Sequence, residues 1–122
     1  VFMYGTLMKG ESRHNVVEKT TSGEMVNATC RGRLLNIGSF PGMIPDADSV
    51  VKGELYSFSD ISDILQRLDS IEGYLGPGKS DSLYTRAIVS VSTPEGSEWA
   101  WTYIYNGRDG SVIDSGDWRH RS

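Results

Sequence analysis

Residues 60–74 read DISDILQRLDSIEGY and have the pattern of a short amphipathic helix. The apolar residues recur at spacings of three and four, which places them on one helical face; they are Ile61, Ile64, Leu65, Leu68 and Ile71. Asp60 suits the N-cap, because its carboxylate accepts hydrogen bonds from N–H groups of the first turn. Gly73 suits a left-handed end of the helix. The sequence therefore predicts a helix that packs its apolar face against the rest of the chain.

Glu72 is unusual in this helix because its carboxylate falls on the apolar face. At about 100° per residue, Glu72 lies about 40° from Leu68 and about 20° from Ile61. A carboxylate on this side should be paired, or should have a raised pKa that lets it exchange a proton near neutral pH. Glu72 is therefore a candidate general acid/base. The alternative is a structural role, in which the side chain bends into solvent or pairs with Arg67 or Arg86.

Outward from this helix, five short segments have the pattern of β-strands; they are residues 1–4, 30–37, 50–58, 84–92 and 98–105. In the last of these, Trp99, Trp101, Tyr103 and Tyr105 alternate with smaller residues and should share one face. Residues 38–42 are turn-rich, and residues 11–20 carry a weak helical pattern. Short strands with one helix predict an α+β fold, a small mixed, mostly antiparallel, barrel-like β-sheet with one main helix.

The composition indicates one globular domain over residues 1–122, with 38% hydrophobic and 23% charged residues. The net charge of −4 argues against nucleic acid and anionic membrane surfaces as partners. We find no signal peptide and no apolar run near the roughly 20 residues that span a bilayer. The single cysteine, Cys30, excludes an internal disulfide and fits a reducing compartment without requiring one, so we expect a cytoplasmic protein. Its oligomeric state stays open.

Two further sequence features bear on chemistry. Tyr4, Gly5, Thr6 and Leu7 follow the first expected strand, and such a turn can point N–H groups and a hydroxyl at one anion. The alternative is an ordinary tight turn. Cys30 with a histidine would make a nucleophile, although its place in an expected strand favours a buried, unreactive thiol. The two histidines are far apart, and no structural zinc site is expected.

Several of these segments, taken together, resemble the gamma-glutamylcyclotransferase-like family. They are VFMYGTL at 1–7, GELY at 53–56, LDSIEGY at 68–74, YTR at 84–86, WTYIY at 101–105 and SGDW at 115–118. The resemblance runs from residue 1 to residue 118, and the gamma-glutamylamine cyclotransferase branch, which has the same Tyr-Gly-Thr-Leu opening, looks closest.

The resemblance implies a function and assigns roles to particular residues. Family members release 5-oxoproline and an amine or amino acid from a γ-glutamyl compound, without a metal or organic cofactor. By match, the turn formed by Tyr4, Gly5, Thr6 and Leu7 (the 4–7 turn) would bind the glutamyl head group. Glu72 would be the catalytic acid/base. We expect a small-molecule γ-glutamyl substrate.

Some roles remain open at this point. Tyr84 and Tyr105 are candidates for supporting hydroxyl contacts, and both also fit a packing role. The loop at residues 76–82, with Lys79 and Asp81, is expected to border the half of the pocket that holds the leaving group. A non-catalytic module of the same fold, which binds a small ligand or a protein, is the alternative to an enzyme. A cysteine-dependent hydrolase that uses Cys30 is a third hypothesis.

Overall fold

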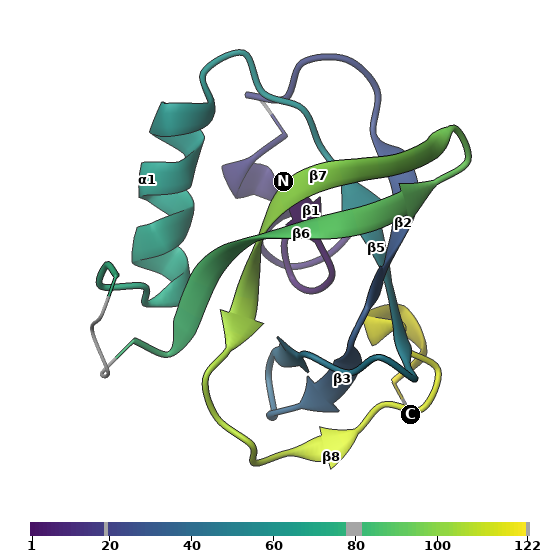
Figure 1. Cartoon of the computed structure of the whole chain (residues 1–122). Coiled ribbons are helices and arrows are strands. Elements are labelled where there is room, and N and C mark those ends of the chain that lie inside the picture. Colours follow the sequence, from purple (N-terminus) through teal and green to yellow (C-terminus); the bar gives the residue numbers. More distant parts are fainter. Residues whose placement is uncertain (19, 78–81, 122) are drawn as a thin grey trace.

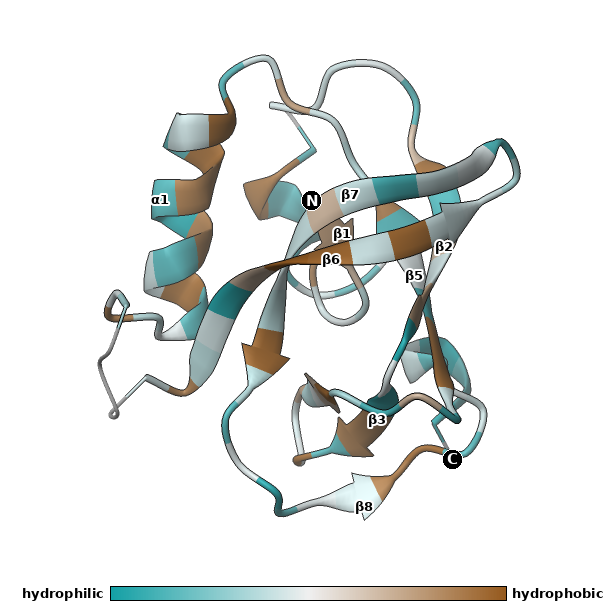
Figure 2. Ribbon diagram, viewed as in Figure 1, coloured by the Kyte–Doolittle hydropathy of each residue, from teal (hydrophilic) through white to brown (hydrophobic). Residues whose placement is uncertain are grey.

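The structure, a computed structural model, describes residues 1–18, 20–77 and 82–121, and its helix α1 (Ile61–Glu72) confirms the predicted one (Figure 1). The Asp60 carboxylate accepts from the N–H of Asp63 at 3.1 Å, and Gly73 has the left-handed φ of 68°. The brown, apolar side of α1 faces the sheet (Figure 2), where Ile64, Leu65 and Leu68 are buried. Ile61 belongs to that face by helical period, but it lies in the first turn and is 39% exposed.

The strands of the described chain form two antiparallel sheets, which confirms the α+β prediction (Figure 1). The larger sheet has the order β1-β5-β2-β6-β7 and the smaller has the order β4-β3-β8. The bounds are β1 Phe2–Met3, β2 Val26–Arg31, β3 Arg33–Asn36, β4 Pro41–Ile44, β5 Val50–Leu55, β6 Tyr84–Thr93, β7 Gly96–Tyr105 and β8 Ser111–Val112. Short 3-10 helices, η1 (His14–Val16) and η2 (Trp118–His120), complete the elements.

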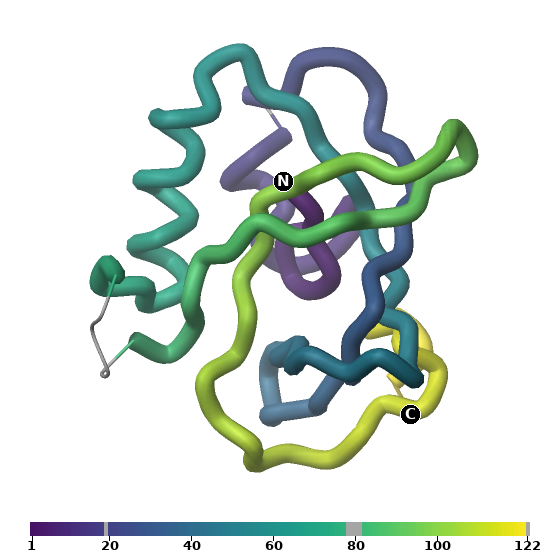
Figure 3. Tube along the Cα trace, in the orientation of Figure 1, coloured from purple at the N-terminus to yellow at the C-terminus, as the bar shows by residue number. Residues whose placement is uncertain are grey.

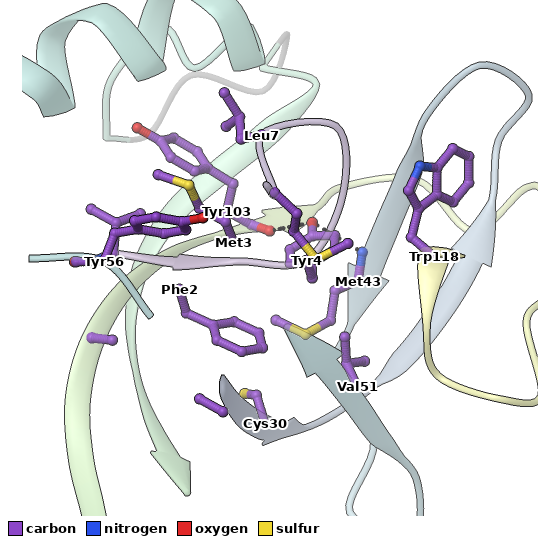
Figure 4. Close-up of a cluster of buried hydrophobic side chains, with 14 of the residues drawn as sticks. Phe2, Met3, Tyr4, Leu7, Cys30, Met43, Val51, Tyr56, Tyr103 and Trp118 are labelled. Atoms are coloured by element: carbon purple, nitrogen blue, oxygen red, sulfur yellow. Dashed lines mark hydrogen bonds between the residues drawn. The ribbon is translucent and has the colours of Figure 1, made fainter. Parts of the chain in front are cut away.

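Side-chain hydrogen bonds join the two edges of the larger sheet. The Thr102 hydroxyl on β7 donates to the carbonyl of Phe2 on β1 at 2.9 Å. The Tyr4 hydroxyl donates to the carbonyl of Tyr103 at 2.6 Å and accepts from the N–H of Met43 at 3.2 Å, as the dashed lines in Figure 4 mark. The sheet is therefore nearly closed, with the N-terminal segment passing beneath the β6–β7 hairpin (Figure 3).

The expected strand at residues 30–37 is wrong, because the chain changes sheets within it. β2 ends at Arg31 and β3 begins at Arg33, so Gly32 lies between the two sheets. A Cβ on Gly32 would lie 3.0 Å from the Ile44 carbonyl oxygen. Both strands bury apolar side chains, so the apolar pattern continues across Gly32. The pattern therefore does not mark the change of sheet.

Two other expected segments differ in the structure. The turn-rich segment at 38–42 ends in strand β4, which starts at Pro41, a position where a strand tolerates a residue without an N–H group. The weak helical pattern at 11–20 produces only the single turn η1, and Val17 after it is fully buried.

The aromatic residues of β7 alternate along one continuous strand, as predicted for a shared face, but they differ in burial along it. Trp99 is 77% exposed, whereas Thr102 and Tyr103 are both buried although they point to opposite faces. Both faces of β7 are covered there, because β1 contacts one side and the Tyr103 hydroxyl reaches Asp69 of α1 at 2.6 Å on the other.

We predict that Thr102→Val lowers the free energy of unfolding by about 1–2 kcal/mol, because the buried Phe2 carbonyl loses its donor while the side-chain volume stays nearly the same. Urea denaturation measures the change. Thr85→Val is the matched control, since the exposed Thr85 hydroxyl bonds only to Asn106. Equal effects of the two substitutions would contradict a role of Thr102 in closing the sheet.

Candidate active site

One cavity brings the 4–7 turn and Glu72 together. Its empty space, including the open mouth, measures about 650 Å³. The turn enters from the end of β1, Glu72 from the last turn of α1, and Tyr84 from the start of β6. The residues that line the cavity are Val1, Phe2, Met3, Tyr4, Gly5, Thr6, Leu7, Arg13, Phe40, Pro41, Ile71, Glu72, Leu83, Tyr84, Thr102 and Tyr103.

Glu72 is half-buried at the wall of this cavity. Burial raises the pKa of its carboxyl from 4.5 to about 7, against the opposing charge of Arg13. The arginines considered as structural partners are engaged elsewhere: Arg67 pairs with Asp63 at 3.3 Å and Arg86 with Asp69 at 2.8 Å. Within the described residues, Glu72 itself makes no hydrogen bond or ion pair with another side chain. Its carboxyl is therefore set to exchange a proton near neutral pH.

The 4–7 turn packs tightly on Pro41. A Cβ on Gly5 would lie 2.6 Å from Cγ of Pro41, so only glycine fits at this position. The Gly5 carbonyl accepts from the N–H of Met8 at 3.0 Å, and the Thr6 carbonyl accepts from the N–H of Arg13 at 2.8 Å. In contrast, the N–H groups of Gly5, Thr6 and Leu7 take part in no hydrogen bond within the described chain. The cavity wall thus carries free donors, which are suited to an anion.

The three tyrosines singled out in the sequence differ in their relation to the cavity. Tyr4 and Tyr84 line it, but both hydroxyls are engaged, that of Tyr84 donating to the Pro41 carbonyl at 2.5 Å. Tyr105 is not among the lining residues; its hydroxyl donates to Asp109 and its ring lies 5.7 Å from that of Tyr84. Burial raises the pKa of Tyr84 well above its ordinary value, so it stays protonated. Tyr105 can therefore support the cavity only from behind.

Sequence reasoning missed Arg13 as a site residue. Arg13 directly precedes η1 in a polar stretch, and no periodicity marks it; its backbone N–H donates to the Thr6 carbonyl of the turn that lines the cavity. Of the loop expected to border the pocket, residues 78–81, with Lys79 and Asp81, lie outside the described residues. Leu83, just beyond it, lines the cavity.

A buried carboxylate supports the loop that follows the 4–7 turn. Glu54 of β5 is 3% exposed and accepts from the N–H of Lys9 at 2.7 Å and from the Tyr56 hydroxyl at 2.8 Å. The Arg119 guanidinium from η2 donates to it at 3.1 Å. The C-terminal segment, yellow in Figure 3, therefore packs against the body and supports this loop through Arg119.

The structure bears on other chemistry as well. Cys30 is buried outside the cavity, and burial raises the pKa of its thiol, which disfavours the reactive thiolate. In the part of the chain described, no three His, Cys, Asp or Glu side chains are grouped to hold a metal ion.

None of the helices in residues 1–18, 20–77 and 82–121 has the length and apolar character needed to cross a membrane.

The sequence is similar to known gamma-glutamyl cyclotransferases along almost its whole length. The family model described as "Gamma-glutamyl cyclotransferase, AIG2-like" matches residues 1–120. A gamma-L-glutamyl-butirosin B gamma-glutamyl cyclotransferase from Niallia circulans is 33% identical over 98% of this chain and 74% of its own. A putative gamma-glutamylcyclotransferase from Vibrio cholerae is 31% identical over 99% of this chain and 96% of its own.

Solved structures share the fold. YkqA from Bacillus subtilis aligns over 98% of this chain with a TM-score of 0.75 and 26% identity, and this chain spans only 39% of that protein. The Pyrococcus horikoshii protein PH0828 aligns over 97% of this chain and 87% of its own with a TM-score of 0.65 and 24% identity, which shows a common fold.

The buried Glu54–Arg119 pair predicts a stability effect far from the cavity. Arg119→Gln should lower the free energy of unfolding by about 1–3 kcal/mol, because a buried carboxylate loses its cation. Adding Glu54→Gln should restore part of the loss in urea denaturation. Arg67→Gln, which breaks an exposed pair on α1, is the control and should cost less than about 0.5 kcal/mol. Equal losses for Arg119→Gln and Arg67→Gln would contradict the bracing role.

The raised pKa of Glu72 predicts a pH-dependent stability. A carboxyl with a pKa of 4.5 unfolded and about 7 folded binds its proton more tightly in the folded protein. The stability this adds is complete below about pH 4.5 and is lost as the pH rises through 7. Glu72→Gln keeps a neutral side chain, so its stability relative to wild type should rise by on the order of 2 kcal/mol between pH 5 and 8.

Urea denaturation at a series of pH values measures this difference. The control is Glu98→Gln, since Glu98 lies exposed on β7. If the difference in free energy of unfolding between Glu72→Gln and wild type stays constant from pH 5 to 8, the pKa of Glu72 is the same in the folded and the unfolded protein.

Proposed function

Because the chain belongs to the gamma-glutamyl cyclotransferase family of enzymes, we propose that it releases 5-oxoproline from a γ-glutamyl compound, with Glu72 as the general acid/base. The observation that carries the proposal is the partly buried carboxyl of Glu72, with its pKa near 7, in the same cavity as the 4–7 turn. A base with a pKa near the working pH combines the correct protonation state with sufficient basicity.

The reaction joins two groups of one substrate molecule. The α-amine of the γ-glutamyl group is protonated at neutral pH, and Glu72 takes one proton from it. The freed amine nitrogen attacks the γ-carbonyl carbon and forms the five-membered ring. As the tetrahedral intermediate collapses, the bond from that carbon to the leaving nitrogen breaks, and Glu72 returns the proton to this nitrogen. The ring nitrogen still carries a second proton to lose, and this proton passes to the released amine, which leaves as an ammonium ion. The products are 5-oxoproline and an amine or amino acid.

The rest of the cavity suits binding and charge stabilisation. The free N–H groups of Gly5, Thr6 and Leu7 are donors for the α-carboxylate or for the oxyanion that develops on the γ-carbonyl oxygen. The nucleophile and the carbonyl belong to one molecule. A cavity wall that holds the substrate folded, with the amine close to the carbonyl carbon, therefore accounts for much of the rate acceleration. The Tyr84 hydroxyl holds Pro41, against which Gly5 packs, and the Tyr105 ring lies against that of Tyr84. Every step uses groups of the protein and its substrate alone.

The identity of the leaving group is a separate question. The Niallia circulans relative is named for a γ-glutamyl group on butirosin B, which supports a substrate with a γ-glutamyl amide bond here. Leu83 and Arg13, both exposed, line the cavity and border its open side. The same cavity in a binding module would need no proton acceptor, so the raised pKa of Glu72 favours the enzyme.

Glu72→Gln should lower kcat/KM by about 10³-fold, because the amide cannot accept the proton of the α-amine. The assay measures 5-oxoproline by mass spectrometry with γ-glutamyl amines, γ-glutamyl dipeptides and glutathione as substrates. Glu98→Gln, an exposed change on β7, is the matched control. A folded wild-type protein that binds these compounds but forms no 5-oxoproline is the outcome expected of a binding module. Full activity of Glu72→Gln would remove Glu72 from the mechanism.

A further inference from the structure

Arg13 differs from the other arginines of the described chain because its guanidinium has no protein partner there. Four of the others, Arg33, Arg67, Arg86 and Arg119, form ion pairs with carboxylates. The remaining three, Arg31, Arg108 and Arg121, donate to backbone carbonyls. Arg13 is bonded through its backbone alone: its N–H donates to the Thr6 carbonyl at 2.8 Å, and its carbonyl accepts from the N–H of Val16 at 3.1 Å. Its charged group is therefore available to a ligand.

The position of Arg13 directs this charge into the candidate active site. Arg13 lines the cavity with Glu72 and Tyr84, and its charge opposes the rise in the pKa of both groups. It is nevertheless exposed, so it lies at the mouth rather than at the enclosed end. No other Arg or Lys of the described residues lines the cavity. An anionic group of a bound substrate that extends to the mouth would meet this guanidinium.

We propose that Arg13 binds a carboxylate on the leaving half of the substrate, so that the site takes γ-glutamyl amino acids in preference to γ-glutamyl amines. The inference rests on the proposed function, and it names the substrate class. An arginine is suited to this task because its planar group binds a carboxylate through two parallel hydrogen bonds.

The other carboxylate of the substrate, on the α-carbon of the glutamyl group, has separate donors. The N–H groups of Gly5, Thr6 and Leu7 are free, and Gly5 is buried against Pro41 at the inner wall. Two donor sets, one on the buried wall and one at the mouth, match a substrate with two carboxylates. A γ-glutamyl amine carries only one and would leave Arg13 without a partner.

The test compares two substrates that differ only by one carboxylate, γ-glutamyl-alanine and γ-glutamyl-ethylamide. With wild-type protein, KM should be at least about 10-fold lower for γ-glutamyl-alanine, as expected for a charge-assisted hydrogen-bonded pair. Arg13→Gln should raise KM for γ-glutamyl-alanine to the value for the ethylamide, with kcat nearly unchanged. Arg13→Lys should keep part of the preference, because it keeps the charge but not the paired donors. Arg67→Gln, on the exposed side of α1, is the control.

The possible outcomes separate this inference from the proposed function. An equal rise in KM for both substrates in Arg13→Gln would show that Arg13 binds the α-carboxylate, and equal KM values in wild type would show no role in substrate choice; either result overturns the inference while 5-oxoproline still forms. Wild-type protein that forms 5-oxoproline from neither substrate would overturn the proposed function, and the inference with it.

Discussion

The hydroxyl of Tyr4 is the single group on which the architecture around the cavity most depends. It donates to Tyr103 of β7 and accepts from Met43 of β4, so it ties the end of β1 to both sheets (Figure 4). β1 is only two residues long and pairs with β5 alone along its backbone. Tyr4 anchors the start of the turn that follows, beside the packing of Gly5 on Pro41, and an unpaired hydroxyl at this depth would be costly. Tyr4 thus serves the cavity chiefly as a structural anchor.

The charged side chains of the protein also differ in whether they have partners. Three carboxylates of the protein differ in environment: Asp69 is held by Arg86 and Tyr103, and Glu54 by Arg119 and Tyr56, whereas Glu72 has no such partner within the described residues. A paired carboxylate is stabilised in its charged form, while an unpaired one that is partly buried holds its proton to higher pH. Asp69 and Glu54 thus have ion-pair partners, whereas Glu72 is partly buried without one, which suits the proton transfer proposed for it.

Arg13 and Glu72 form a complementary pair of unsatisfied charges at one cavity. Each is free of protein partners in the part of the chain described, and each is close enough to affect the pKa of Tyr84. Unpaired charges that are partly removed from water lower the stability of a folded protein, and a ligand of opposite charge that pairs with them offsets this cost. This arrangement is consistent with a site that gains its full set of interactions only when a charged substrate is bound.

The sequence by itself determined the helix, the fold class and the conspicuous carboxylate. The helix α1 follows from local chemistry, since apolar spacing and the caps Asp60 and Gly73 act within a few residues. The place of Glu72 on the apolar face is likewise a matter of helical period. Its acid/base role stays a prediction.

Only the tertiary structure decided which residues meet. The switch of sheets at Gly32 was invisible because both strands beside it bury apolar side chains. Thr102 and Tyr103 are both buried because β1 packs on one face of β7 and α1 on the other, and the sequence of β7 does not show either contact. Arg13 lines the cavity, and its backbone N–H donates to the Thr6 carbonyl. Periodicity reports the environment of a residue relative to its own element, whereas contacts between elements depend on long-range packing, which a single sequence does not display.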